Sequence, residues 1–168
     1  MTEPAIYPRR VLITGATGAI GSELARLYAR PGRELILQGR RAQTLDALAQ
    51  ECRRQGAEVA SHVLDLSDDT RLSGWLDTMQ TDGLPDLVIA NAGRNAHAGA
   101  GQVTESAADM RALLAVNVWA PLTMANRLTP AMAERGYGQF VFVSSLAAWY
   151  GLPVTPVYSA SKAALKAY

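Results

Sequence analysis

Short apolar runs alternate with amphipathic stretches along the 168-residue chain, and this alternation limits the folds that the chain can adopt. The spacing predicts strands over residues 10–14, 34–38, 58–64, 86–90 and 139–144. It predicts helices over 19–29, 42–55, 68–80 and 105–134, the last broken near Pro121 and Pro130, and a final helix from Pro156 to the end. Strands that alternate with helices of this length form a parallel sheet covered on both faces. We therefore expect one α/β domain over residues 1–168, a doubly wound sheet with strand order 3-2-1-4-5.

The first predicted strand leads directly into a glycine-rich turn and then into a helix. Residues 11–21 have the sequence VLITGATGAIG, which contains Gly15, Gly18 and Gly21. Glycine lets the backbone pass close to a pyrophosphate, and the start of a helix presents unpaired N–H groups to it. The turn therefore predicts a Rossmann-type dinucleotide site, with an ordinary strand–turn–helix corner as the alternative.

Polar residues and glycines also follow the other predicted strands. They are Gly39, Arg40 and Arg41 after the second strand, Asp65 after the third, Asn91, Ala92 and Gly93 after the fourth, and Ser144 and Ser145 after the fifth. In a doubly wound sheet the carboxyl ends of the strands border the ligand crevice. Packing alone does not require such residues at every strand end, so the pattern supports a nucleotide site.

Tyr158 and Lys162 stand four residues apart in the last predicted helix, and Ser145 precedes the tyrosine by thirteen residues. Positions i and i+4 share one helix face, so the ammonium group can reach toward the phenol. A free tyrosine has a pKa of about 10, and lowering it to about 7 requires about 4 kcal/mol of preferential phenolate stabilisation. A neighbouring lysine in a site of low dielectric can supply this stabilisation, and a serine hydroxyl can hold the substrate oxygen. Surface decoration of a helix is the alternative interpretation of the pair.

Composition and charge exclude several other classes of function. The chain is 49% hydrophobic and 18% charged with a net charge of +1, so neither nucleic acid nor an anionic membrane is an expected partner. The first ten residues lack the apolar core of a signal peptide, and no run of 18 apolar residues is present. The single cysteine, Cys52, suits a reducing interior, so we expect a cytoplasmic location. His97 lacks partners at metal-ligand spacing and His62 lies in a predicted strand, so we expect no metal site.

The motifs taken together resemble those of the short-chain dehydrogenase/reductase family, in the branch with an Asn-Ser-Tyr-Lys catalytic tetrad. Those that agree in order and spacing are Thr14-Gly15 through Gly21, Asp65, Asn91-Ala92-Gly93, Asn117, and Ser145 with Tyr158 and Lys162. The resemblance covers the chain from about residue 10 to its last residue. Each motif alone is weak, but their shared order makes coincidence improbable.

The resemblance implies a role for each member of the tetrad. Tyr158 is then the general acid/base, Lys162 lowers its pKa and binds the nicotinamide ribose, and Ser145 orients the substrate oxygen. Asn117 would hold a water that links Lys162 to bulk solvent. Pro121, four residues after Asn117, removes the N–H that would bond its backbone carbonyl, which leaves that carbonyl available to water. A buried asparagine bonded to neighbouring backbone is the alternative for Asn117.

The resemblance also implies which residues hold the dinucleotide. They are Gly15, Thr17, Gly18, Ile20 and Gly21 in the glycine-rich turn, Arg40 and Arg41, Asp65 and Leu66 at the adenine, Asn91, Ala92 and Gly93 at the ribose, and Tyr158 and Lys162. The alternative for Asp65 is a helix N-cap, for which Ser67 and Asp68 are better placed. A plain turn is the alternative for residues 91–93.

The end of the second predicted strand bears on the choice between NADP(H) and NAD(H). Members that prefer NAD(H) tend to have an acidic residue there, which bonds the ribose 2′-hydroxyl. This chain has Gly39 at that place, followed by Arg40 and Arg41. A guanidinium group can bind a 2′-phosphate through paired N–H groups. We therefore expect NADP(H) to be preferred, with two solvated loop arginines as the alternative.

Two departures from the family pattern stand out. Ala19 replaces a glycine in the turn, and the resulting spacing is more typical of the epimerase/dehydratase branch. The chain also stops at Tyr168, before the sixth and seventh strands that members of the family normally have. From this we expect a domain truncated at its C-terminal end, with the fifth strand at a bare sheet edge.

These observations lead to one preferred function and two alternatives. The preferred function is an NADP-dependent oxidoreductase that interconverts a carbonyl and a secondary alcohol. Trp149, Tyr150, Leu152, Pro153 and Val154 suggest an apolar wall for a small-molecule substrate, with loop aromatics that only cover the core as the alternative. The resemblance further implies a homodimer or homotetramer, formed through the helices over 105–134 and from Pro156 onward. The alternatives are a non-catalytic dinucleotide-binding module and an epimerase or dehydratase of the same family.

Overall fold

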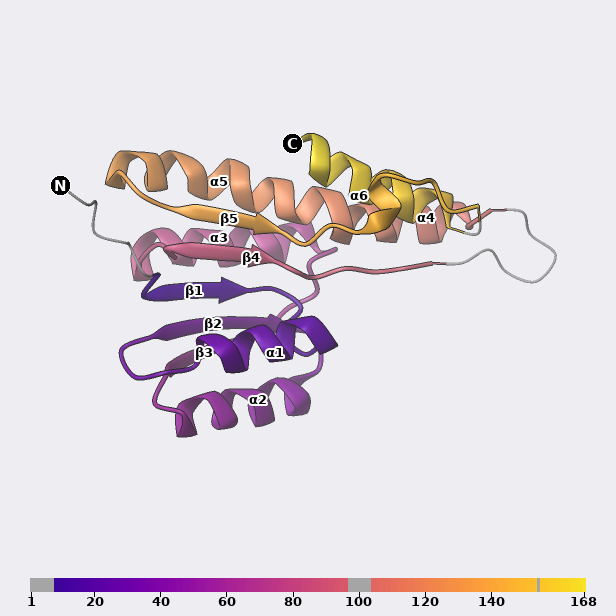
Figure 1. The fold of residues 1–168 in the computed structure, drawn as a ribbon. Helices are drawn as coiled ribbons and strands as arrows, with labels where there is room; N and C mark the ends of the chain where they lie inside the picture. The colour runs from indigo at the N-terminus through magenta and orange to yellow at the C-terminus, as the bar shows by residue number, and fades with distance from the viewer. Residues whose placement is uncertain (1–7, 97–103, 154) are drawn as a thin grey trace.

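A parallel β-sheet forms the centre of the molecule in the computed structural model, which describes residues 8–96, 104–153 and 155–168 (Figure 1). Its strands follow the order β3-β2-β1-β4-β5, and every pair of neighbours is parallel. They are β1 (Arg10–Ile13), β2 (Glu34–Gly39), β3 (Glu58–Val63), β4 (Leu87–Ala90) and β5 (Gln139–Phe142). The predicted fold class and strand order are therefore confirmed.

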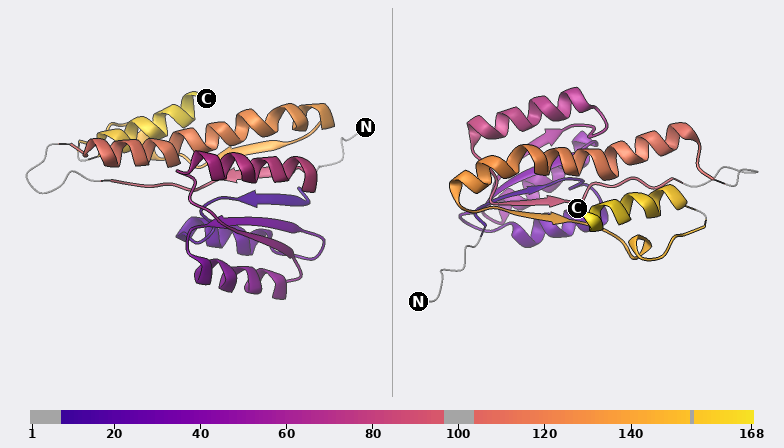
Figure 2. Two further views of the ribbon diagram at one scale, coloured as in Figure 1. Left: turned by 180° about the vertical axis from the view of Figure 1, so that it is seen from behind. Right: turned by 90° about the horizontal axis from the view of Figure 1, so that it is seen from above.

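Helices cover both faces of this sheet. They are α1 (Ala19–Tyr28), α2 (Ala42–Arg54), α3 (Asp69–Asp82), α4 (Ala107–Leu114), α5 (Ala120–Arg135) and α6 (Pro156–Ala167). Figures 1 and 2 show α1 and α2 on one side of the sheet and α3 and α5 on the other, with α6 beside α4. Within the residues that the structure describes, no helix is both long and apolar enough to span a bilayer.

Alternating side chains of the central strands divide the core into two layers. Val11 and Ile13 of β1 pack with residues of α1 and α2, whereas Leu12 packs with residues of α3 and α5. All three side chains are completely buried. This alternation follows from the period of two along a strand, and a strand that is apolar on both faces must be covered twice. The sheet is therefore held rigidly, which fixes its carboxyl ends relative to one another.

The helical region predicted over 105–134 is irregular near Pro121, as expected, but continues through Pro130. It runs from Ala107 to Arg135 and contains a π-helical turn, Ala115–Trp119, in which the N–H of Ala120 bonds the carbonyl of Ala115. Pro121 lies in the first turn of α5, where a missing N–H costs little. The break predicted near Pro130 is wrong, because Pro130 lies inside α5. Pro130 is exposed, so water can bond the carbonyl four residues earlier, which receives no N–H from the proline ring.

Candidate active site

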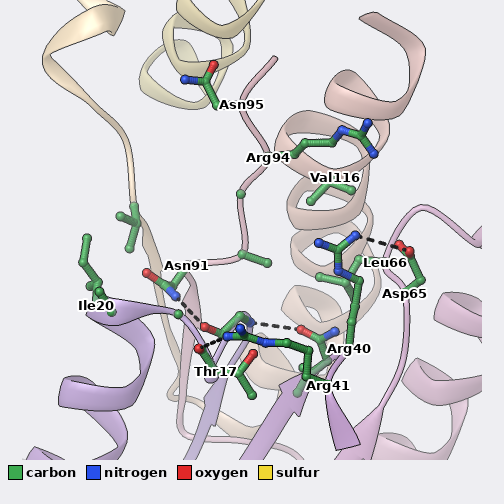
Figure 3. A pocket seen from close by; sticks show the side chains of 18 of the residues that line it. Thr17, Ile20, Arg40, Arg41, Asp65, Leu66, Asn91, Arg94, Asn95 and Val116 are labelled. Carbon is green, nitrogen blue, oxygen red and sulfur yellow. Dashed lines mark hydrogen bonds and ion pairs between the residues drawn. The ribbon is translucent and has the colours of Figure 1, made fainter. Parts of the chain in front are cut away.

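A cavity of about 590 Å³ lies beyond the carboxyl ends of the strands, where the sequence predicted a ligand crevice. Its volume falls in the range of about 300–1,000 Å³ that is usual for ligand sites. The predicted site residues that line it are Gly15, Thr17, Gly18, Ile20, Arg40, Arg41, Asp65, Leu66, Asn91, Ala92, Gly93, Tyr158 and Lys162. Figure 3 shows several of these side chains around the cavity. Tertiary structure thus gathers residues from five strand ends and α6 around one space.

The glycine-rich turn is held in place by the residues that follow β4. Gly15 has a φ of +63°, and a Cβ at this position would lie 2.8 Å from the Cα of Ala92. The side-chain amide of Asn91 donates to the carbonyls of Thr14 at 3.0 Å and Gly15 at 3.2 Å. In return, the hydroxyl of Thr14 accepts hydrogen bonds from the backbone N–H groups of Asn91 and Ala92. The side chain of Asn91 therefore stabilises the turn.

The three glycines of the turn occupy different environments. Gly18 is the N-cap of α1 and has no side chain to bond the first N–H groups of that helix, so these groups can donate to an anion. Gly21 does not line the cavity; it is buried under the turn, where a Cβ would overlap the carbonyl oxygen of Gly15. Ala19 lines the cavity at the exposed first position of α1, so its extra methyl group is accommodated.

Gln38 lines the cavity but was not among the predicted site residues. Its side chain is 2% exposed and accepts the N–H of Gly15 at 3.0 Å. Its amide nitrogen donates to the carbonyl of Leu64 at 2.5 Å. Gln38 thus joins the glycine-rich turn to the end of β3. A polar residue within the otherwise apolar run 35–38 was the available signal.

Arg40, Arg41 and Asp65 lie together at one end of the cavity (Figure 3). Arg40 approaches Asp65 at 3.6 Å, and Arg41 donates to the carbonyl of Thr17 at 2.5 Å. The carboxylate of Asp65 accepts the N–H and the hydroxyl of Ser67, and these hydrogen bonds with the nearby Arg40 lower its pKa despite partial burial. The N-cap of α3 is Asp68, which accepts the N–H of Arg71 at 3.0 Å. The N-cap alternative for Asp65 is therefore wrong.

Tyr158 and Lys162 lie on one face of α6 and both line the cavity. The Nζ of Lys162 is 5.9 Å from the centre of the Tyr158 ring and donates to the carbonyl of Val143 at 2.7 Å. Lys162 is 4% exposed, and this burial lowers its pKa. A Cβ at Gly93 would lie 3.7 Å from the Nζ, so glycine leaves space beside the ammonium group. The pair is therefore positioned at the cavity and is not surface decoration.

Asn117 and Ser145, the other two predicted catalytic residues, do not line the cavity. The side chain of Asn117 is fully buried and bonds both the N–H and the carbonyl of Arg94, at 2.7 and 2.8 Å. It also donates to the hydroxyl of Ser161 in α6 at 3.1 Å. The hydroxyl of Ser145 accepts the N–H of Ala147 at the start of a short 3₁₀ turn. Instead it is Ser144 that lines the cavity, and its hydroxyl donates to the carbonyl of Lys162.

An apolar surface borders α6 on the side of residues 146–153. Leu146, Trp149 and Tyr150 are exposed, and Leu152 is partly exposed at 42%. A second hollow of about 380 Å³ lies here, lined by Trp149, Leu152 and Pro153 together with small residues of α6. Val154 and His97, which entered the sequence predictions, lie outside the described residues.

Comparison with known proteins agrees with this fold. The model of the short chain dehydrogenase family matches residues 9–168, so the chain belongs to this family. Its sequence is 33% identical over 166 residues to dehydrogenase/reductase SDR family member 7B of Bos taurus, a match that covers 94% of this chain and 50% of that protein. It is 31% identical over 177 residues to a fatty acyl-CoA reductase of Mycobacterium tuberculosis, with coverage of 99% and 59%.

A solved structure supports the same assignment. A gluconate 5-dehydrogenase from Beutenbergia cavernae, crystallised with bound NADP at low occupancy, superimposes with a TM-score of 0.85 and 29% sequence identity. The superposition covers 94% of this chain and 62% of that structure. The chain therefore spans about half to three-fifths of the length of these relatives.

Proposed function

We propose that the chain forms the dinucleotide-binding and proton-transferring part of an NADP-dependent oxidoreductase that interconverts a carbonyl and a secondary alcohol. The observation that carries this proposal is the position of Tyr158 and Lys162, which line the same cavity as the glycine-rich turn. A proton-transfer group and a phosphate-binding turn in one cavity suit a reaction in which a dinucleotide and a substrate meet.

The cavity suits a dinucleotide in both its shape and its donor groups. The uncapped start of α1 at Gly18 would bind the pyrophosphate. Asp65 would accept the adenine amino group, and the space beside Gly93 would admit the nicotinamide ribose next to Lys162. When bound, the nicotinamide exchanges a hydride with the substrate carbon.

Tyr158 would exchange the proton that accompanies the hydride. A protonated Lys162 near the ring would stabilise the phenolate, and burial strengthens this interaction because little water screens it. The water proposed at the backbone carbonyl of Asn117 would connect Lys162 to solvent. The side chain of Asn117 is committed to Arg94 and Ser161, so it would support this relay by holding α6 in place.

We further propose an apolar substrate and an assembled enzyme. The aromatic surface of Trp149 and Tyr150 beside α6 favours a hydrophobic carbonyl or alcohol. Contacts between copies through α4, α5 and α6 would give a homodimer or homotetramer. Sedimentation of the complete protein at micromolar concentration should show such an assembly, whereas a stable monomer would contradict it. The buried free thiol of Cys52 suits a reducing compartment such as the cytoplasm.

Replacement of Tyr158 by phenylalanine tests the proposed reaction. The variant Tyr158→Phe keeps the ring but removes the hydroxyl, so kcat for carbonyl reduction should fall by about 10²–10⁴-fold. The dissociation constant for NADPH, measured by fluorescence titration, should change little. Tyr28 lies in α1 and does not line the cavity, so Tyr28→Phe is the matched control and should retain activity.

The same assay separates the alternatives. A non-catalytic binding module would bind NADPH but show no turnover with any carbonyl in either form. An epimerase or dehydratase would turn over substrate with no net change in nicotinamide absorbance. Either result would contradict the proposed reaction.

A further inference from the structure

Glu105 is a buried carboxylate that contacts the first turn of α6, the helix that carries Tyr158 and Lys162. Its residue is 6% exposed and precedes α4 by two positions. The Oε1 of Glu105 accepts the backbone N–H of Val157, the residue before Tyr158, at 3.1 Å. The hydroxyl of Thr104 donates to Oε2 at 3.0 Å. The carboxylate thus connects the segment before α4 to the start of α6.

The start of α6 lacks the capping group that a helix normally takes from its own sequence. Thr155 occupies the N-cap position but forms no side-chain cap, and its buried hydroxyl has no partner among the described residues. Pro156 has no N–H, so the first N–H groups that need an acceptor belong to Val157 and Tyr158. Glu105 accepts that of Val157, and a negative charge is favoured at this end of the helix dipole.

Glu105 is held in its charged form by these contacts. Burial opposes ionisation, but hydrogen bonds from the backbone N–H of Glu105 itself, from Thr104 and from the first turn of α6 outweigh it and lower the pKa of Glu105 overall. Hydrogen bonds to an ionised acceptor are about twice as strong as those between neutral groups. The contact between the Glu105 carboxylate and the start of α6, here called the anchor, is therefore strong at neutral pH.

Other contacts secure α6 further along its length. Asn117 bonds Ser161 in the middle of the helix, and Ser144 bonds the carbonyl of Lys162. Neither bonds the first turn directly, whereas Glu105 bonds the backbone N–H of Val157, next to Tyr158. Loss of Glu105 would free the turn that carries the phenol while leaving the lysine held.

We propose that Glu105 is a positioning residue that fixes the Tyr158 phenol in its reactive place by capping α6 from another segment. This proposal rests on the proposed function of Tyr158. Glu105 does not line the cavity, so it acts through the backbone of the first turn of α6 and does not touch the reacting groups.

Variants of Glu105 in the complete enzyme test this role through kinetics. Glu105→Ala removes the acceptor, so kcat should fall by about 10–100-fold, as expected for a displaced catalytic group. The dissociation constant for NADPH should stay within about twofold of the wild type, because the phosphate-binding turn is untouched. Glu105→Gln retains an acceptor oxygen and should recover most of the lost kcat. Glu134→Ala, exposed on α5, is the control and should match the wild type.

Amide hydrogen exchange of the same variants measures the anchor without relying on turnover. Glu105→Ala should accelerate exchange at Val157, with Leu165 unchanged, and Glu105→Gln should restore protection. Unchanged exchange and unchanged kcat would overturn the proposal, as would a general loss of protection and of NADPH binding that glutamine fails to rescue. If the wild type reduced no carbonyl but exchange still responded as described, the proposed reaction would be wrong and the anchor supported.

Discussion

Arg40 and Arg41 differ in how their guanidinium groups are engaged at the cavity. The side chain of Arg40 is 62% exposed and meets Asp65 at 3.6 Å, a long ion pair that contributes little in solvent. Arg41 donates to the carbonyl of Thr17 and so also supports the turn. Arg40 is therefore the better placed of the two to change partners and bind a 2′-phosphate.

We predict that Arg40→Ala weakens NADPH binding by about 10–100-fold, because a hydrogen bond to a charged group contributes about 1.5–3 kcal/mol. NADH lacks the phosphate, so its dissociation constant should change by less than about twofold. Titration of both cofactors against wild type, Arg40→Ala and the control Arg54→Ala on α2 measures the effect. Equal losses for both cofactors, or tighter binding of NADH by the wild type, would contradict the preference for NADP(H).

Two buried polar residues, Asn117 and Gln38, show how far a single position can be interpreted from the sequence. Asn117 was recognisable because it interrupts an apolar helix, yet its bonds to Arg94 and Ser161 join segments far apart in the chain. Gln38 was missed because a polar residue near a strand end is usually exposed. Its partners, Gly15 and Leu64, lie 23 and 26 residues away, and only the folded sheet brings them together.

The glycine-rich turn is an element whose geometry excludes side chains at particular places. At Gly21 a methyl group would overlap the Gly15 carbonyl, whereas Gly74, in the interior of α3, has open space around it. We predict that Gly21→Ala destabilises the protein by about 1–3 kcal/mol through overpacking. Gly74→Ala should stabilise it by about 0.5–1 kcal/mol, because alanine favours a helix. Urea unfolding measures both, and equal effects would contradict the close approach at Gly21.

The helix between β4 and β5 shows a limit of prediction from local signals. Of the two breaks that its prolines predicted, the one near Pro121 is present as the π-helical turn Ala115–Trp119, whereas the helix continues through Pro130. This turn contains Asn117, whose side chain is bonded to Arg94 and Ser161. Such long-range contacts can stabilise a wider turn; Pro121 signals the irregularity locally, but the partners of Asn117 leave no local signal in the sequence.

The burial of Lys162 affects how the stability of the whole protein depends on pH. Because burial lowers its pKa, the folded protein releases this proton at a lower pH than the unfolded chain, whose lysine pKa is about 10.4. Between these two values the unfolded state binds more protons, so stability should rise with pH. Below the folded pKa both states are protonated and this contribution does not vary.

Urea unfolding of wild type and Lys162→Met across the alkaline range tests this sign. The unfolding free energy of the wild type should rise relative to that of Lys162→Met as pH approaches about 10.4. Lys166→Met alters an exposed lysine of the same helix, so its unfolding free energy should change with pH as that of the wild type does. A constant difference between wild type and Lys162→Met would show that burial does not shift this pKa.

The sequence by itself determined the alternation of strands and helices, the strand order, the family and most residues of the cavity. These properties follow from patterns that are local, such as apolar periodicity, or that stand at the ends of strands, which a parallel sheet gathers at one edge. Tertiary structure alone decided that Gly21 packs beneath the turn, that Gln38 joins two strands, and that Glu105 caps a helix 52 residues away. The physical reason is that a buried polar group takes whichever partner the fold brings near it, and a local pattern does not encode that partner.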